Sequence, residues 1–281
     1  MAKEKVLISV KTYPTLSQKY GELVCTAGFR EDGSWIRIYP IPFRQIESKY
    51  RKWQWIELDL VPHQSDARKE SFRPVDVDDI ILGDFIDTKL KGAWEERKRF
   101  ALRKVYSNME ELIKEAKDRK VGTSLAVFKP TEIIDFKWKP CEREWDEEKV
   151  KALYAKFQMK SLFEEDEEEV KKYFKLVDKV PYEFSYVFKS EDGKERTLMI
   201  EDWEVGALFH RYITQYRFSE EDACKKVKEK YFEDFVKTKD LYFFLGTTQE
   251  HHFRSKNPFI IIGTFTPPKI TGPIHPSLDL F

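Results

Sequence analysis

Two apolar segments joined by a tight turn, within residues 21–42, constrain the fold of this chain more than any other feature. The first reads GELVCTAGF, the second reads SWIRIYPIP, and Arg30-Glu31-Asp32-Gly33 connects them. Asp-Gly between β-branched, apolar runs is a strong signal for a hairpin. VLISVKTYP before the hairpin and WQWIELDLV after it have the same character. We therefore expect the chain to begin as a small twisted antiparallel sheet or partial barrel.

Alternation along the second hairpin strand separates two faces. One face holds Trp35, Arg37 and Tyr39, and the other holds Ile36 and Ile38. Because successive side chains of a strand point to opposite sides, the isoleucine face is expected in the core and the other face in solvent. Pro40 and Pro42 are expected to stop the strand, since proline cannot donate to a ladder. The segment HQSDARKESFRP that follows the next strand is expected to be a polar loop.

From about residue 93 the periodicity becomes helical. AWEERKRFALRKV and SNMEELIKEAKDRK are typical of helices, the second opened by Ser107 with Glu110 as a capping box. Further helices are expected at 145–178, 202–216 and 220–237, with strands between them and two apolar strands near the end. We predict an α+β fold, in which a β-rich aromatic-basic subdomain (1–90) packs on a mixed helical and β subdomain (91–281) that ends in a β-hairpin.

Charge is balanced over the whole chain but not along it. The sequence has 50 Lys+Arg and 50 Asp+Glu, yet residues 1–52 contain ten cations and five acids, a net of +5. The acid excess lies elsewhere, notably in EEDEEE at 164–169. Neutrality argues against an indiscriminate polycation, and the local excess predicts that any nucleic acid is held by one face.

The cysteines and the apolar runs indicate the compartment. Cys25, Cys141 and Cys224 are too widely spaced for a disulfide framework or a CxxC clip. No apolar run approaches the roughly 20 residues that span a bilayer, and no export signal is visible. We expect a cytoplasmic protein without a membrane partner. The charged fraction of 36%, with few Met and Cys, favours a thermophilic source.

Residues 33–55 interleave aromatic and basic side chains. Aromatic faces stack on single-stranded or flipped bases, while Lys and Arg neutralise phosphates. The candidates are Trp35, Tyr39 and Trp53 for stacking and Arg37, Arg44, Arg51 and Lys52 for phosphate. The alternative is that the rings fill a small β core and the cations are ordinary surface. DNA or RNA is accordingly the leading partner.

A second cluster lies in SDARKESFRP, where Asp66, Arg68, Glu70, Ser71 and Arg73 are close in sequence. Opposite charges at this spacing favour a compact ion-pair network. The sharper alternative is that Arg68 and Arg73 form a phosphate clamp.

Acidic and histidine residues offer weak catalytic candidates. Asp202 and Glu204 belong to Glu201-Asp202-Trp203-Glu204, followed on the same expected helix by His210. An acid in the first turn is also what a helix N-cap requires, and a carboxylate two turns from His210 cannot pair with it directly.

The end loop GTTQEHHF contains the remaining candidate, His252. Its neighbour His251 points to the opposite side of an extended chain, so the two histidines are not expected to share a site. The sequence lacks GxGxxG, GxxxxGK[ST], HExxH, GxSxG and paired CxxC motifs. We therefore expect no cofactor and no metal.

Several motifs resemble an uncharacterised family of bacterial and archaeal proteins. They are KTYPTLSQKYGELVCTAGF, WIRIYPIPFR, the D-x-R-x-E-S of residues 66–71, TSLAVFKP, IEDWEVGALF and KDLYFFLGTTQEHHF…PFIIIGTFTPPK. The resemblance covers nearly the whole chain. It implies genes that lie among mobile-element and defence genes, and hence the handling of nucleic acid. Members carry a Cys…Cys…Gly-His cluster before DWE that resembles a zinc site, and YVFKSEDGKERTLMIEDWE here has neither residue type.

Three functions are compatible with these observations. The leading one is a nucleic-acid-binding protein, an accessory component of genome defence or of DNA or RNA processing. The second is an enzyme acting on nucleotides or nucleic acid through an Asp/Glu/His site. The third is a scaffold for a nuclease or guided effector chain, which the Pro-rich end TPPKITGPIHPSLDLF and the acidic run would contact.

Overall fold

The computed structural model describes residues 3–17, 21–43, 50–90, 92–161 and 176–269. Arg44, the acidic run at 164–169 and residues 270–281 of the Pro-rich end lie outside these ranges. The predictions made for them are therefore not addressed by the fold.

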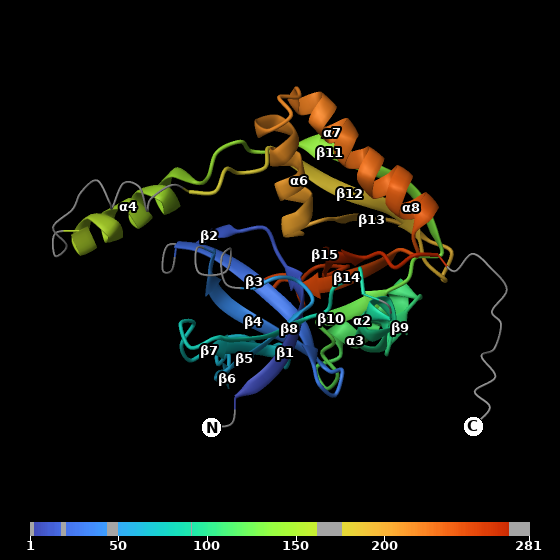
Figure 1. Ribbon diagram of the computed structural model, residues 1–281, viewed down its shortest axis with the longest axis horizontal. Coiled ribbons are helices and arrows are strands. Elements are labelled where there is room, and N and C mark those ends of the chain that lie inside the picture. Colours follow the sequence, from blue (N-terminus) through green and yellow to red (C-terminus); the bar gives the residue numbers. More distant parts are fainter. Residues whose placement is uncertain (1–2, 18–20, 44–49, 91, 162–175, 270–281) are drawn as a thin grey trace.

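The first 85 residues form a curled, mostly antiparallel sheet (Figure 1, blue to cyan). Its strands are β1 (Glu4–Lys11), β2 (Thr15–Ser17), β3 (Gly21–Arg30), β4 (Trp35–Pro42), β5 (Gln54–Leu58), β6 (Leu60–Pro62), β7 (Ser71–Pro74) and β8 (Ile81–Phe85). They are ordered β6-β7-β4-β3-β1-β5-β8, and β2 pairs with β3. β3 and β4 form the predicted hairpin, whose Gly33 has a φ of 78° that favours glycine.

This sheet differs from the sequence prediction at two places. β4 continues to Pro42 instead of ending before Pro40. The pairing of β3 with β4 shifts register between Val24 and Thr26, and Leu23 and Val24 then pair with Pro42 and Ile41. Residues 71–74 form β7 instead of a loop. They do so because β4 and β6 lie on either side and supply hydrogen-bond partners for the backbone.

The rest of the chain adds two smaller sheets and helices, so the α+β prediction is confirmed. One sheet has the order β15-β14-β10-β9, formed by β9 (Val105–Tyr106), β10 (Leu125–Phe128), β14 (Tyr242–Thr247) and β15 (Phe259–Phe265). The other has the order β11-β12-β13, formed by β11 (Glu132–Pro140), β12 (Tyr182–Lys189) and β13 (Glu195–Met199). Isolated bridges, Thr12 to Asp202 and Ile200 to Ile261, connect the sheets.

Helices pack against the smaller sheets, and Figure 1 shows α7 and α8 along the upper side of β11 and β12, with α6 beside these strands. The helices are α2 (Ala93–Ala101), α3 (Met109–Lys117), α4 (Glu147–Ser161), α6 (Trp203–Thr214), α7 (Glu220–Lys228), a π-helical segment (Glu229–Asp234) and α8 (Phe235–Thr238). Among the described residues, no helix has both the length and the apolar character needed to cross a membrane.

The helices expected at 202–216 and 220–237 begin where the sequence predicts. Asp202 caps α6 and Ser219 caps α7, each accepting a hydrogen bond from the first turn. α3 instead begins one residue later than predicted, because Asn108 accepts from the backbone of Glu110 and Glu111. The Ser107 hydroxyl donates to Glu191 instead.

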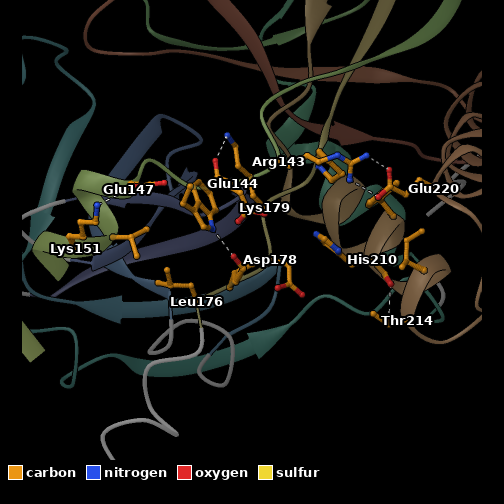
Figure 2. A pocket seen from close by; sticks show the side chains of 16 residues that line it. Arg143, Glu144, Glu147, Lys151, Leu176, Asp178, Lys179, His210, Thr214 and Glu220 are labelled. Carbon is orange, nitrogen blue, oxygen red and sulfur yellow. Dashed lines mark hydrogen bonds and ion pairs between the residues drawn. The ribbon is translucent and has the colours of Figure 1, made fainter. Parts of the chain in front are cut away.

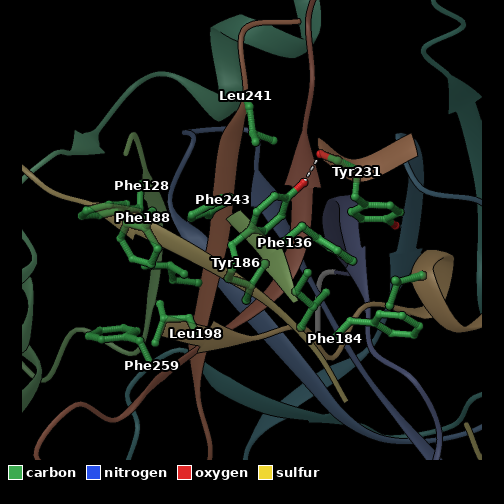
Figure 3. Packing of buried hydrophobic residues seen from close by; sticks show 14 of the residues in the cluster. Phe128, Phe136, Phe184, Tyr186, Phe188, Leu198, Tyr231, Leu241, Phe243 and Phe259 are labelled. Atoms are coloured by element: carbon green, nitrogen blue, oxygen red, sulfur yellow. Dashed lines mark hydrogen bonds between the residues drawn. The ribbon is translucent and has the colours of Figure 1, made fainter. Parts of the chain in front are cut away.

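The hydrophobic core is continuous between the first 103 residues and the remainder. One cluster combines Leu7, Val10, Phe29, Trp53 and Phe100 with Leu125, Val127, Phe244, Ile262 and Phe265. A second, largely aromatic cluster lies under α6 and α7 (Figure 3). There the ring of Tyr186 stacks on Phe243 at 5.0 Å and its hydroxyl donates to the Tyr231 carbonyl at 2.5 Å. Aromatic residues therefore fill the core between elements that are far apart in the sequence.

Candidate nucleic-acid interface

The structure buries several of the side chains predicted to contact nucleic acid. Arg37 is 2% exposed, Trp53 is 7% exposed and Arg68 is 9% exposed. Lys52 is also largely covered, because it forms ion pairs at the N-terminus of α6. Alternation along β4 predicts that the face with Arg37 is exposed. The sheet that contains β10 and β14 covers this face, and Arg37 is therefore buried. A phosphate or base cannot reach these four side chains in this structure.

The other described candidates are more accessible but are not gathered in one place. Trp35 and Tyr39 are half-buried, whereas Arg51 and Arg73 are exposed. Arg51 precedes β5 and Arg73 lies on β7, and the sheet order places β4, β3 and β1 between these strands. Four strand spacings of about 4.8 Å therefore separate β7 from β5 along the sheet.

A buried polar network joins the D-x-R-x-E-S segment to the C-terminal part. The guanidinium of Arg37 donates to the hydroxyls of Ser71 and Ser124 at 3.1 and 2.9 Å. The carboxylate of Glu70 accepts from the backbone N–H and hydroxyl of Ser124 at 3.2 and 3.0 Å. Burial, and then the charge of Arg68, lowers the pKa of Arg37. Ser124 is therefore the point where a guanidinium and a carboxylate of the first sheet meet the second sheet.

Arg68 extends this network to the end of β14. Its Nε lies 2.8 Å from Asp66 Oδ1, and its Nη1 donates to the carbonyl of Thr247. Burial acts to raise the pKa of Asp66, but the hydrogen bonds and charge of Arg68 lower it to about 2. The Thr247 hydroxyl lies 2.8 Å from Nδ1 of His252, whose pKa is lowered by burial and by Arg68. The guanidinium of Arg68 is thus occupied by internal partners.

Three loops meet next to this network, and we call them the three-loop face: residues 63–70, 117–124 and 247–256. Lys69 donates to the carbonyl of Lys120, which joins the first loop to the second. Gln249 donates to the carbonyl of Ser65, which joins the third loop to the first. The face therefore combines segments that are more than 180 residues apart in the chain.

The three-loop face carries a local excess of positive charge. Its segments contain seven Lys/Arg and four Asp/Glu, a net of +3 in a molecule that is neutral overall. Two of the acids, Asp66 and Glu70, are occupied by the buried network. Six cations are exposed and form no ion pair with any residue that the structure describes: Lys69, Lys117, Arg119, Lys120, Arg254 and Lys256. On the third loop, the ring of Phe253 is 46% exposed.

The carboxylates considered as catalytic candidates surround a lysine at the start of α6. Asp202 is fully buried, and its Oδ1 accepts from the Glu204 N–H at 3.3 Å and lies 2.6 Å from Lys52 Nζ. Glu204 Oε2 lies 3.1 Å from the same Nζ. Burial raises the pKa of Asp202 to about 6 despite the opposing charge of Lys52. Burial acts to lower the pKa of Lys52, but the two carboxylates outweigh it and raise that pKa.

His210 lies two turns further along α6, beside an open hollow of about 710 Å³ (Figure 2). Burial lowers the pKa of His210, and its Nε2 has no hydrogen-bond partner among the described residues. Arg143, which shares the hollow, is occupied by Glu220 in two hydrogen bonds of 2.8 and 2.7 Å. The carboxylates at the N-terminus of α6 do not line this hollow, and His252 belongs to the buried network. The four catalytic candidates are therefore not brought together.

The exposed cations of the second and third loops were missed by the sequence analysis. Arg119 and Lys120 follow a helix, and Arg254 and Lys256 lie in a segment considered only for its histidines. Single basic residues in surface loops are common, so their pattern alone carries no signal. Only the meeting of the three loops makes them one surface.

Comparison with known families shows what the chain is related to. Residues 2–103 match the family described as Domain of unknown function (DUF8758), and residues 105–281 match Domain of unknown function (DUF8757). The chain belongs to the DUF8757 family. The expected membership of an uncharacterised family is thus confirmed. No curated protein matches the chain.

A solved structure described as "Structure of murine DNA binding protein bound with ds DNA" aligns with the DUF8757 protein over most of both chains. The alignment covers 97% of this chain and 98% of the other, with 9% identity and a TM-score of 0.30. A score this low does not establish a common fold.

Proposed function

We propose that the protein binds nucleic acid through the three-loop face. The observation that carries this proposal is the gathering of six exposed cations without ion-pair partners among the described residues. A cation already paired with a carboxylate exchanges one anion for another when phosphate binds. An unpaired cation releases counterions and gains affinity.

Other basic surfaces of the molecule differ from this face. On α7 and the π-helical segment, Lys225, Lys226 and Lys230 pair with acids three or four residues away, at 2.5–2.7 Å. The net field of that surface is weak because each positive charge has a close negative partner. The three-loop face is the better match for a polyanion.

The face also has the rigidity and the apolar contact that nucleic-acid sites use. The buried network of Arg37, Arg68 and Ser124 fixes the loop backbones with hydrogen bonds and does not use the outer cations. The exposed ring of Phe253 lies on the same face and offers a stacking surface for a base.

Fluorescence anisotropy with labelled oligonucleotides of about 20 nucleotides tests the proposal. Single-stranded and double-stranded DNA and single-stranded RNA are compared at about 50 and 200 mM salt. We expect the variant Lys120→Ala, Arg254→Ala, Lys256→Ala to bind at least about tenfold more weakly than the wild type at low salt. Its salt dependence should be shallower by a slope of about 3, one for each lost phosphate contact.

The matched control removes the same charge from paired cations, in Lys225→Ala, Lys226→Ala, Lys230→Ala. Its affinity should stay within about twofold of the wild type. Absence of binding by the wild type at low salt, or an equal loss in both triple variants, would show that the three-loop face is not the binding surface.

A role in genome defence is inferred from the family resemblance alone. The segments considered for docking a nuclease or effector lie mostly outside the described residues. Because the catalytic candidates are not brought together, we propose binding and not catalysis.

A further inference from the structure

A second site lies on another part of the molecule, in a cavity of about 240 Å³ beside the N-terminus of α6. Elements from both parts of the chain enclose it. Tyr13 comes from the segment after β1, Trp145 from the segment before α4, Tyr182 from β12 and Glu201 from the residue before the α6 cap. The volume is suited to a small molecule or to the end of a longer one.

Glu201 is the distinctive residue of this cavity. Its backbone is fixed, since its N–H donates to the carbonyl of Ile261 at 2.8 Å and its carbonyl accepts from Tyr13 at 3.2 Å. Its carboxylate is half-buried and makes no hydrogen bond or ion pair with any residue that the structure describes. Burial, and then the charge of Glu183, raises the pKa of Glu201. A partly desolvated carboxylate without a partner is stabilised by any counter-charge that enters the cavity.

The other charged groups around the cavity are already balanced. Glu183 pairs with Lys139 at 2.9 Å, and Asp202 pairs with Lys52 at 2.6 Å. Lys179, a cation that also lines the cavity, donates to the carbonyl of Glu144 at 3.1 Å and pairs with Glu142 at 3.5 Å. The cavity therefore keeps one unbalanced negative charge, on Glu201.

The aromatic side chains around the cavity offer ring surface and no free polar atom. The hydroxyl of Tyr13 donates to the carbonyl of Asp178 at 2.6 Å, and the hydroxyl of Tyr182 donates to Glu220 at 2.9 Å. The indole N–H of Trp145 donates to the carbonyl of Val177 at 2.8 Å. The ring of Trp145 already lies 5.7 Å from the ammonium of Lys179. Aromatic faces beside an unpaired carboxylate are the combination that binds organic ammonium ions.

A metal ion fits these surroundings less well. The described residues contain no group of three or more His, Cys, Asp or Glu side chains that could hold one. Calcium and magnesium need several oxygen ligands, whereas Glu201 alone is available here. An ammonium ion needs one counter-charge and apolar walls for its carbon atoms.

We propose that this cavity binds a small alkylammonium group, with Glu201 as its counter-charge and the rings of Tyr13, Trp145 and Tyr182 as its walls. The group could belong to a free amine or to a lysine side chain of a peptide, and both present the same chemistry to the cavity. The proposal is independent of nucleic-acid binding, because none of these residues belongs to the three-loop face.

Isothermal titration calorimetry of the full chain tests it with choline, n-butylammonium and a lysine-containing tripeptide. We expect binding of at least one of these, and no more than a tenth of that affinity for 3,3-dimethylbutan-1-ol, the neutral analogue of choline, or for butan-1-ol. The comparison uses only the wild-type protein, so it does not depend on the folding of a variant. Binding of the free amines identifies a small-molecule site, and binding of the tripeptide alone identifies a side-chain site.

The variant Glu201→Gln keeps the size of the side chain and removes the charge, so ammonium affinity should fall at least about tenfold. The control Glu183→Gln changes a paired carboxylate in the same cavity, and its affinity should stay within about threefold. Absence of binding by the wild type at about 10 mM of every ammonium probe would overturn the proposal. Equal binding of choline and its neutral analogue, or equal loss in the two variants, would overturn it as well.

Discussion

Lys52 and Asp202 form an ion pair that is almost completely excluded from solvent and that connects two parts of the molecule. Only 11% of the Lys52 side chain and none of the Asp202 side chain is exposed, and their charged atoms are 2.6 Å apart. Oδ2 of Asp202 has no hydrogen-bond partner among the described residues. Burial of a pair like this one costs desolvation that the attraction only partly offsets.

The raised pKa of Asp202 predicts how this pair responds to pH. The pKa of Asp202 is about 6 in the folded protein and 3.8 ordinarily, so folding favours the protonated carboxyl. The stability gained from this protonation is complete below pH 3.8 and is lost as the pH rises to about 6. Asp202→Asn removes this titration and keeps an N-cap acceptor. From pH about 4 to about 7, the wild type should lose up to about 3 kcal/mol of unfolding free energy relative to the variant. Urea unfolding of both proteins measures this difference, and a relative gain by the wild type would contradict the assignment.

The sequence predicts the structural role of an individual residue but not which distant residue it contacts. Asp202 follows a strand and precedes a helical pattern, so its role as a cap could be predicted from neighbouring residues. Its pairing with Lys52, 150 residues away, depends on how the sheets pack. For the same reason Arg37 was predicted to be exposed: strand alternation shows which residues share a face but not whether another sheet covers that face.

Helix α3 shows how closely the start of an element can be predicted. Ser107 and Asn108 are both good N-cap residues, and the sequence pattern favoured Ser107. The structure chooses Asn108, whose side chain accepts from two backbone N–H groups at 3.0 and 3.3 Å.

Alanine substitution distinguishes the two cap residues. We expect Asn108→Ala to lower the unfolding free energy by about 1 kcal/mol, because two backbone donors lose their acceptor. Ser107→Ala removes only a hydrogen bond to the exposed Glu191, so its effect should be no more than about 0.5 kcal/mol. Chemical unfolding followed by circular dichroism measures both, and a larger loss for Ser107→Ala would refute the assigned cap.

Helices and strands with a strong local sequence pattern were predicted. Those that form only because adjacent strands supply hydrogen-bond partners were not. The β3–β4 hairpin follows from Asp32-Gly33 between apolar runs, and α6 and α7 follow from their caps. β7 is polar and short, and it is a strand only because β4 and β6 lie beside it. The π-helical segment at 229–234 has no local signature that distinguishes it from the α-helix before it.

One hydrophobic cluster of the molecule is shared by the two parts of the chain that different families match. Trp53 of the first part packs on Phe244 and Phe265 of the second, at ring distances of 6.2 and 5.2 Å. Neither part can bury these rings without the other. The boundary between the matched families is therefore not a boundary between independent cores.

A shared core predicts a single unfolding transition. Tryptophan fluorescence and far-ultraviolet circular dichroism should give coincident midpoints in guanidinium chloride, because loss of either part exposes the core of the other. The truncated chain 1–104 should lack a cooperative transition. Two separated midpoints, or a folded truncated chain, would contradict this expectation.

The candidate interface could be predicted from the sequence only in part, because its loops are far apart in the sequence. The buried residues of the D-x-R-x-E-S segment were identified as a charged cluster, and the structure uses them as the support of the three-loop face. The outer cations such as Lys120 and Arg254 come from loops that meet only in the folded molecule. A local excess in the chain, such as the +5 of residues 1–52, is instead reduced by ion pairs with acids from outside the segment, such as Lys52 with Asp202.

The contact of Arg68 with Thr247 joins residues 179 positions apart, so it can form only late in synthesis. The ribosome releases the first loop of the face long before the third, and the first sheet has no second sheet to cover it in that interval. The supporting network can close only after residue 247 has emerged. In a nascent chain the three-loop face is therefore completed only once most of the chain has been made.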